Sequence, residues 1–97
     1  MEERDYLILL YDFYGDLFQE RQKEYFESYY FQNLSLGEIG NNLGVSRNAV
    51  HKALRGMEEK LKFYEEKLKM FQMNRQICDI IKENDSKIIK KRLEELV

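Results

Sequence analysis

The stretch Leu34 to Leu54, LSLGEIGNNLGVSRNAVHKAL, decides the fold of this chain, because it holds two helix-start signals on either side of one glycine turn. Ser35 and Glu38 have the spacing of a capping box, in which the hydroxyl accepts an N–H of the first turn and the carboxylate accepts the serine N–H. Ser46 supplies a second N-cap oxygen. Gly44 lies where a residue with positive φ is expected. Two short helices joined by such a turn form a helix-turn-helix.

The apolar residues of this stretch fall on one side of each expected helix. In the first helix they follow steps of three and four and comprise Leu36, Ile39 and Leu43. In the second helix the inward face is expected to comprise Ala49, Val50 and Leu54. Asn41 and Asn42 are expected to face water, and Val45 to turn inward between the helices. Gly40 should let the two helices approach closely.

The outward face of the second helix has the chemistry of a major-groove reader. Its polar side chains fall at helical steps and comprise Arg47, Asn48, His51, Lys52 and Arg55. Between Ser46 and Met57 there are three basic residues and no acid. Cationic groups neutralise phosphate, and planar amide or ring groups pair with base edges. The stripe therefore indicates a nucleic-acid contact, and the alternative is the solvated face of an amphipathic helix.

Composition favours one compact, all-helical domain over residues 1–97. The 97 residues contain no Pro and five Gly, and 43% are hydrophobic. Neither an apolar leader nor a run of roughly 20 apolar residues is present, which favours the cytoplasm. The lone His51 and the lone Cys78 form no nucleophile pair and no zinc ligand set. We therefore expect no catalysis, no metal and no cofactor.

Charge is unevenly distributed along the chain. Residues 1–30 carry three basic and eight acidic groups and have a charge of −5. Residues 31–62 carry five basic and three acidic groups (+2), and residues 63–97 carry eight and seven (+1). The net charge of the chain is −2. Proteins whose affinity rests on counterion release usually have a larger basic excess. Either two copies present two basic faces, or the contact with DNA is weak, or the partner is not DNA.

The rest of the chain also has helical periodicity. A first helix is expected to end near Gly15–Asp16, and its apolar face comprises Leu7, Leu10, Tyr14 and Leu17. A second is expected from about Glu20 to Phe31, after the weak cap Gln19. The helix that begins at Ser46 has no clear stop, and Asn74 is a candidate bend. Shorter terminal helices are expected, broken around residues 84–86, with Asp85 or Ser86 as a cap.

A heptad-like seam follows the helix-turn-helix and comprises Leu54, Met57, Leu61, Tyr64, Leu68 and Phe71. Such a seam can pair with a second copy or fold under the amino-terminal helices. In a small chain, part of it is expected to pack against Leu7, Leu10 and Tyr14. The remainder is available for a homodimer.

Several motifs together resemble the YlxM-type helix-turn-helix proteins of bacteria. They are Tyr14-Gly15, QKEYFESYY at residues 22–30, LSLGEI at 34–39, GVSRNAVH at 44–51 and YEEKL at 64–68, so the likeness covers roughly residues 6–72. The core is also similar to the DNA-binding region 4 of sigma factors. The resemblance implies an all-α helix-turn-helix bundle with a long helix after the turn. The periodicity places the helix-turn-helix at about 35–56 and a helical extension at about 57–97. It also implies a small cytoplasmic regulator linked to the signal recognition particle pathway through gene neighbourhood.

Two functions remain open at this point. The first is a dimeric regulator that binds DNA or structured RNA, in which Arg47, Lys52 and Arg55 neutralise phosphate while Asn48 and His51 approach bases. The second is a protein-interaction module whose acidic amino-terminal third, including Glu20, Glu24 and Glu27, docks on a basic partner or ribonucleoprotein such as the signal recognition particle.

Overall fold

The computed structural model describes residues 1–82 and 86–96. Its elements are α1 (Glu3–Tyr14), the 3-10 turn η1 (Gly15–Leu17), α2 (Glu20–Tyr30), α3 (Leu36–Leu43), α4 (Arg47–Leu68), α5 (Met70–Ile81) and α6 (Ser86–Leu96). No strand occurs among the described residues. The all-α class is confirmed, as is a helix-turn-helix, α3 and α4, followed by a helical extension.

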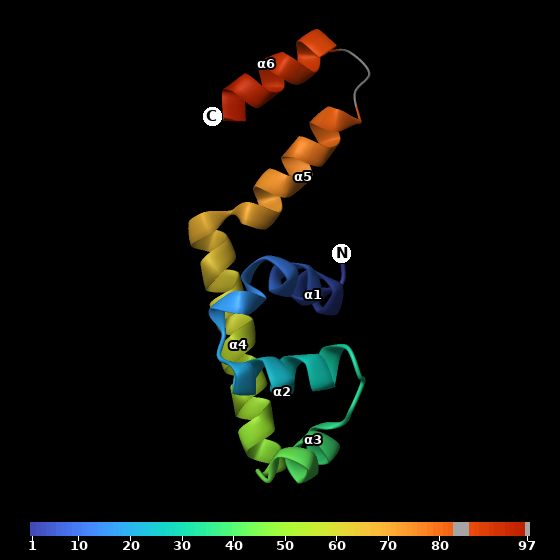
Figure 1. The fold of residues 1–97 in the computed structure, drawn as a ribbon, viewed down its shortest axis with the longest axis vertical. Coiled ribbons are helices and arrows are strands. Elements are labelled where there is room, and N and C mark those ends of the chain that lie inside the picture. The colour runs from blue at the N-terminus through green and yellow to red at the C-terminus, as the bar shows by residue number, and fades with distance from the viewer. Residues whose placement is uncertain (83–85, 97) are drawn as a thin grey trace.

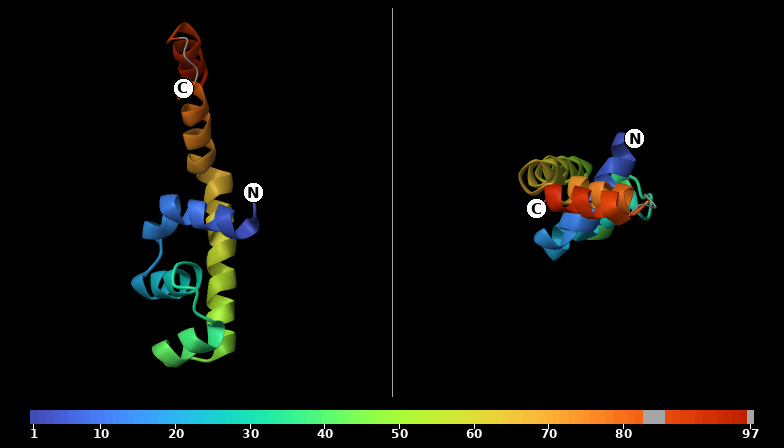
Figure 2. Two further views of the ribbon diagram at one scale, coloured as in Figure 1. Left: turned by 90° about the vertical axis from the view of Figure 1, so that its right-hand side faces the viewer. Right: turned by 90° about the horizontal axis from the view of Figure 1, so that it is seen from above.

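Helix α4 is the axis on which the other helices are arranged (Figure 1). α1, α2 and α3 each pack against it, at successive positions along its length. α5 and α6 pack on each other and continue past α1 as an arm (Figure 2). The expected compact shape is wrong, because the chain measures 57 × 22 × 20 Å and its radius of gyration is 17.4 Å, against roughly 12–13 Å for a compact chain of this length.

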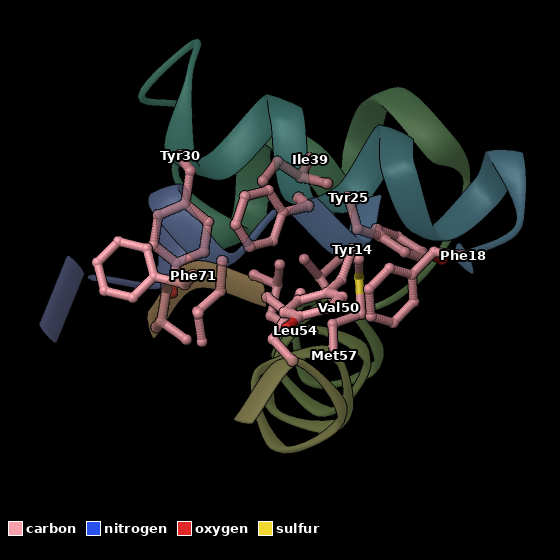
Figure 3. Packing of buried hydrophobic residues seen from close by; sticks show 13 residues of the cluster. Tyr14, Phe18, Tyr25, Tyr30, Ile39, Val50, Leu54, Met57 and Phe71 are labelled. Atoms are coloured by element: carbon pink, nitrogen blue, oxygen red, sulfur yellow. The ribbon is translucent and has the colours of Figure 1, made fainter. Parts of the chain in front are cut away.

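The core lies where α1, α2 and α3 meet one face of α4 (Figure 3). Its buried residues are Leu7, Leu10, Tyr14, Phe18, Tyr25, Phe26, Tyr30, Ile39, Val50, Leu54, Met57, Leu61 and Phe71. The ring of Phe26 stacks on Tyr11 and on Tyr30, with centroid distances of 4.1 and 4.3 Å. Leu17 does not join this core and is 59% exposed. Its predicted place on the apolar face is wrong because α1 ends at Tyr14 and Leu17 lies in η1.

The heptad-like seam is covered within the chain, as predicted for part of it. Leu54, Met57, Leu61 and Phe71 are buried, and Tyr64 is half-buried against the same cluster. Only Leu68 of the six seam residues is well exposed, at 56%. The buried part of the seam is therefore not available to a second copy, and a homodimer stays a prediction. A spacing of three and four specifies an apolar face, and here α1 and α2 supply the surface that covers it.

Hydrogen bonds hold α2 on α4 and α1 on α2. The hydroxyl of Tyr30 donates to Glu58 Oε1 at 2.6 Å. Burial raises the pKa of Tyr30 well above the usual value for a phenol, and the hydrogen bond to Glu58 raises this pKa further. Arg4 Nη2 donates to the carbonyl oxygen of Tyr30 at 2.8 Å and so ties α1 to the end of α2.

The bend between α4 and α5 occurs at Lys69, so the expectation of a bend at Asn74 is wrong. Lys69 has φ 55° and ψ 32°, a left-handed conformation that is uncommon for a residue with a Cβ. The buried carboxylate of Glu65 accepts the hydroxyl of Tyr14 at 2.6 Å and the N–H groups of Phe71 and Gln72, each at 3.1 Å. Glu65, a residue of α4, thus accepts hydrogen bonds from two backbone N–H groups in the first turn of α5 that have no partner within that helix.

The predicted break between the terminal helices falls partly outside the described residues. α5 ends at Ile81 and α6 begins at Ser86. Asp85, one of the two predicted caps, lies outside the described residues, as does Asn84. Lys90 and Lys91 are exposed on α6.

Candidate nucleic-acid interface

Helix α3 begins with the predicted capping box. The N–H of Glu38 donates to Ser35 Oγ, and the N–H of Ser35 donates to Glu38 Oε1, both at 3.1 Å. The Ser35 N–H favours the ionised carboxylate and so lowers the pKa of Glu38. These two bonds fix the start of α3 at Leu36, which sets the register of the motif.

The turn that follows α3 has the expected glycine chemistry. Gly44 takes φ 71° and ψ 31°, in the left-handed region. The N–H of the next residue, Val45, donates to the carbonyl oxygen of Gly40 at 2.9 Å. A Cβ at Gly40 would lie 2.6 Å from the carbonyl oxygen of Val45, which confirms close approach as the reason for this glycine. Val45 is half-buried against the core, as expected.

Helix α4 begins at the predicted position. Ser46 Oγ accepts the N–H of Ala49 at 3.1 Å, so Ser46 is the N-cap. Val50 and Leu54 face the core and are buried. Ala49 is exposed, so its predicted place on the inward face is wrong. It lies about 100° round the helix from Val50.

All five predicted contact residues lie on the outside of α4, namely Arg47, Asn48, His51, Lys52 and Arg55. Within the part of the chain that the structure describes, none of these side chains makes a hydrogen bond, an ion pair or a ring contact with another residue. We name this set the α4 polar stripe. It lies at one end of the molecule, beside α3 (Figure 1).

The first turn of α4 and the start of α3 enclose a shallow depression of about 260 Å³. It is lined by Leu36 from α3 and by Arg47, Asn48 and His51 from α4. The structure therefore brings the two predicted base-reading residues, Asn48 and His51, together with one cationic group. No acidic residue lies between Arg47 and Met57 on α4. The local surface is therefore suited to an anionic partner.

One contact that holds the motif on the body was missed by sequence reasoning. Arg21 Nη2, from α2, donates to the carbonyl oxygen of Leu43 at 2.7 Å. This bond satisfies one of the unpaired carbonyl groups at the end of α3, immediately before the turn. The two residues are 22 positions apart. Periodicity cannot indicate such a pairing.

Over residues 1–82 and 86–96, no group of three or more His, Cys, Asp or Glu side chains is placed to hold a metal ion. In the same residues no helix has the length and apolarity that crossing a membrane requires.

Comparison with known proteins finds several UPF0122 proteins among the relatives of this chain. A UPF0122 protein of Caldanaerobacter subterraneus is 48% identical over 58 residues, which is 60% of this chain and 50% of that protein. The UPF0122 protein of Malacoplasma penetrans is 38% identical over 84 residues, 79% of this chain and 75% of its own length. The UPF0122 protein of Ureaplasma urealyticum is 38% identical over 90 residues, which is 92% of this chain and 91% of that protein.

The coverage differs between these relatives. The match spans about half the length of the Caldanaerobacter protein, and nearly all of the Ureaplasma one. Residues 1–97 also match the family described as "UPF0122: Putative helix-turn-helix protein, YlxM / p13 like". This agrees with the resemblance found in the sequence. The chain belongs to the UPF0122 family of YlxM/p13-like helix-turn-helix proteins.

Proposed function

We propose that this protein is a non-enzymatic, cytoplasmic regulator that binds DNA or structured RNA through the α4 polar stripe. The proposal is supported by the exposure of these five side chains and by their lack of partners within residues 1–82 and 86–96. They project from the capped start of a helix, they are exposed, and they have no partner among the described residues. The alternative, a helix face that is merely solvated, predicts that nucleic-acid binding does not depend on these side chains.

The roles of the stripe residues follow from their chemistry and position. Arg47, Lys52 and Arg55 place positive charge along the helix and neutralise phosphate. Asn48 and His51 lie in the first two turns, where the side chains of a recognition helix reach base edges. The N-terminus of α4 adds the partial positive charge of a helix dipole.

The charge of the whole chain limits how tightly one copy binds. The acidic excess lies in residues 1–30, which form α1, η1 and α2. We therefore retain a homodimer in the proposal, because two copies double the number of phosphate contacts. Since the rest of the seam is buried, a dimer needs the surface around Leu68, the one well-exposed residue of the six. An apolar depression of about 300 Å³ at the base of the arm is suited to it, lined by Phe13, Leu68, Met70, Met73, Asn74 and Ile77.

The binding test uses fluorescence anisotropy at low salt. The probes are a random-sequence DNA duplex and the RNA of the signal recognition particle, which the family resemblance suggests as a ligand. Lys52→Glu should weaken binding by at least about tenfold, since it replaces a phosphate contact with a repulsive charge. The matched control is Lys82→Glu, which reverses an exposed charge at the end of α5. No binding to either probe, or equal effects of the two substitutions, would contradict the proposal.

A dimer is tested separately by light scattering. Met73→Lys places a charge in the apolar depression and should shift the mass toward that of one chain. Leu17→Lys alters an exposed leucine that does not line the depression and should leave the mass unchanged. A wild-type mass of one chain at all concentrations would contradict the dimer and leave the binding proposal in place.

A second candidate function rests on the opposite charge. A depression of about 420 Å³ beside η1 is lined by Tyr11, Asp12, Gly15, Asp16, Glu20, Lys23, Glu27 and Phe31. Lys23 is engaged there by Asp16 and Glu20, at 3.3 and 3.6 Å. Phe31 is 46% exposed and adds an apolar edge. This surface is suited to a basic segment of a protein.

Pull-down of signal recognition particle components tests this candidate. The charge-reversed variant carries Lys at positions 20, 24 and 27, and it should lose capture if the acidic surface is the docking site. Unchanged capture would exclude this surface. The α4 polar stripe is intact in the variant, so nucleic-acid binding provides a control for folding.

A further inference from the structure

A second face of α4, next to the polar stripe, has features that the fold does not explain. Its residues recur at steps of four, four, three and four and are Lys52, Gly56, Lys60, Phe63 and Lys67. All five are exposed. They extend over about 22 Å of helix, at 1.5 Å per residue. We name this set the α4 lysine track. It begins at Lys52, within the polar stripe, and continues toward the arm.

The glycine in the track has no packing role. A Cβ at Gly56 would meet nothing within 4 Å, whereas one at Gly40 would meet backbone at 2.6 Å. Gly56 also lies inside α4 with ordinary helical geometry rather than at a turn. A glycine in an exposed helix interior weakens the helix by roughly 1 kcal/mol relative to alanine. A missing side chain on an exposed helix face leaves room for a ligand backbone to approach closely.

The aromatic residue in the track is also placed for contact with a ligand. Phe63 is 54% exposed and does not belong to the core. The Nζ atom of Lys67 lies 5.7 Å from the centroid of its ring. An exposed aromatic ring between cationic groups is the arrangement on which unpaired bases stack. Its combination with Gly56 and the lysines distinguishes Phe63 from an ordinary exposed phenylalanine.

The charges of the track point to a phosphate backbone. Lys52 and Lys60 make no ion pair within residues 1–82 and 86–96, and Lys67 contacts only the ring of Phe63. Glu59 and Glu66 are exposed on the adjoining face, but no acid falls within the track itself. Seen from above, α4 lies along one edge of the molecule, with the other helices to one side of it (Figure 2). The residues of α4 that are buried under the other helices, such as Leu54 and Leu61, lie on a different face of α4 from the exposed track.

We propose that the α4 lysine track binds an unpaired nucleic-acid strand that continues from the duplex held by the polar stripe. The backbone passes close over Gly56, Lys52 and Lys60 contact its phosphates, and one base stacks on Phe63 beside Lys67. The ligand is a junction between paired and unpaired nucleotides, in DNA or in RNA. This inference rests on the proposed function for the paired part of the ligand.

The test compares a blunt random-sequence duplex with the same duplex carrying an unpaired overhang, made once in DNA and once in RNA. For the wild-type protein the overhang should tighten binding. Phe63→Ala should remove that gain, a loss of about fivefold to 150-fold for one stacked base, and should leave blunt-duplex affinity unchanged. Lys60→Gln should lower the salt slope for the overhang probe by about 0.7, the value for one phosphate contact of a single strand. Lys82→Gln is the matched control and should change neither quantity.

Substitutions of Gly56 should change stability and affinity in opposite directions, which a purely structural role of this glycine would not produce. Gly56→Gln should raise Tm by about 2–5 °C, because it removes a helix-weakening residue. The same variant should lose the overhang gain, and Gly56→Ala, with a smaller side chain, should lose less of it. A rise in stability together with a loss of affinity is expected only if a ligand occupies the space above Gly56.

Each outcome separates this inference from the proposed function. Equal affinity of the wild-type protein for blunt and overhang probes would overturn the track and leave duplex binding in place. Overhang binding that survives Phe63→Ala and Gly56→Gln would also overturn it. Binding of the overhang but not of the blunt duplex would overturn duplex recognition and support the track. Binding of neither would overturn both.

Discussion

Replacing Glu65 is expected to destabilise the protein through the junction of α4 and α5. The Glu65 carboxylate is 9% exposed and accepts three hydrogen bonds, from Tyr14, Phe71 and Gln72. In Glu65→Gln the amide oxygen can still accept from Tyr14 and Phe71. The amide NH₂ then faces the N–H of Gln72, so two donors oppose each other. Losing one hydrogen bond to a buried charged group costs about 1.5–3 kcal/mol.

The effect is a large share of the stability of a chain this size, since a domain of about 100 residues has a free energy of unfolding of roughly 5–15 kcal/mol. Urea unfolding followed by circular dichroism measures it. Glu66→Gln is the matched control, because Glu66 is exposed beside Glu65, and it should stay within about 0.5 kcal/mol of wild type. Amide hydrogen exchange should become faster at Gln72 in Glu65→Gln and should not change there in Glu66→Gln.

A double-mutant cycle attributes the loss to the junction. Tyr14→Phe removes the donor to Glu65 and also the oxygen that accepts the N–H of Met70 at 3.0 Å. Because Tyr14 and Glu65 are in direct contact, the cycle should give a coupling energy of about 1 kcal/mol or more. Equal stability of Glu65→Gln and Glu66→Gln, or additive effects of Tyr14→Phe and Glu65→Gln, would refute the assigned role of this carboxylate.

Further substitutions test the local geometry. Lys69→Gly should stabilise the chain by about 0.5–1 kcal/mol in urea unfolding, because Lys69 holds a left-handed conformation that costs a residue with a Cβ. Gly44→Ala should destabilise it by about 1–2 kcal/mol for the converse reason, and Gly44→Asn by less. Ser46→Ala should cost about 1 kcal/mol, the usual effect of losing an N-cap oxygen. The pKa of Glu38 is lower in the folded than in the unfolded chain, so its ionised carboxylate stabilises the fold above the unfolded pKa. This contribution is lost as the pH falls through the folded pKa. Glu38→Gln should therefore lose less stability than the wild-type protein on acidification.

The helix-turn-helix could be predicted because local chemistry specifies it. The pairing of Ser35 with Glu38, the Ser46 cap and the left-handed Gly44 each involve residues close in sequence, and the structure has all three. The exposure of the α4 polar stripe followed from the same helical register. The family resemblance depended on these residues as well.

The partners of the apolar faces could not be predicted in the same way. The spacing from Leu54 to Phe71 is the same whether the face meets a second copy or α1 and α2. The bend between α4 and α5 could not be predicted either, because nothing in the sequence around Lys69 weakens a helix. It is stabilised by Glu65 and by Tyr14, which is 51 positions away from Glu65. The arm and the elongated shape follow from that contact rather than from any local signal.

Backbone amide shifts recorded by NMR during titration with duplex DNA, and then with structured RNA, test the nucleic-acid contact most directly. The amides of Ser46 to Arg55 should move furthest with at least one of the two ligands, and those of α6 should stay in place. Shifts confined to the acidic surface of α1 and α2, or no shifts at low salt with either ligand, would contradict recognition by the α4 polar stripe.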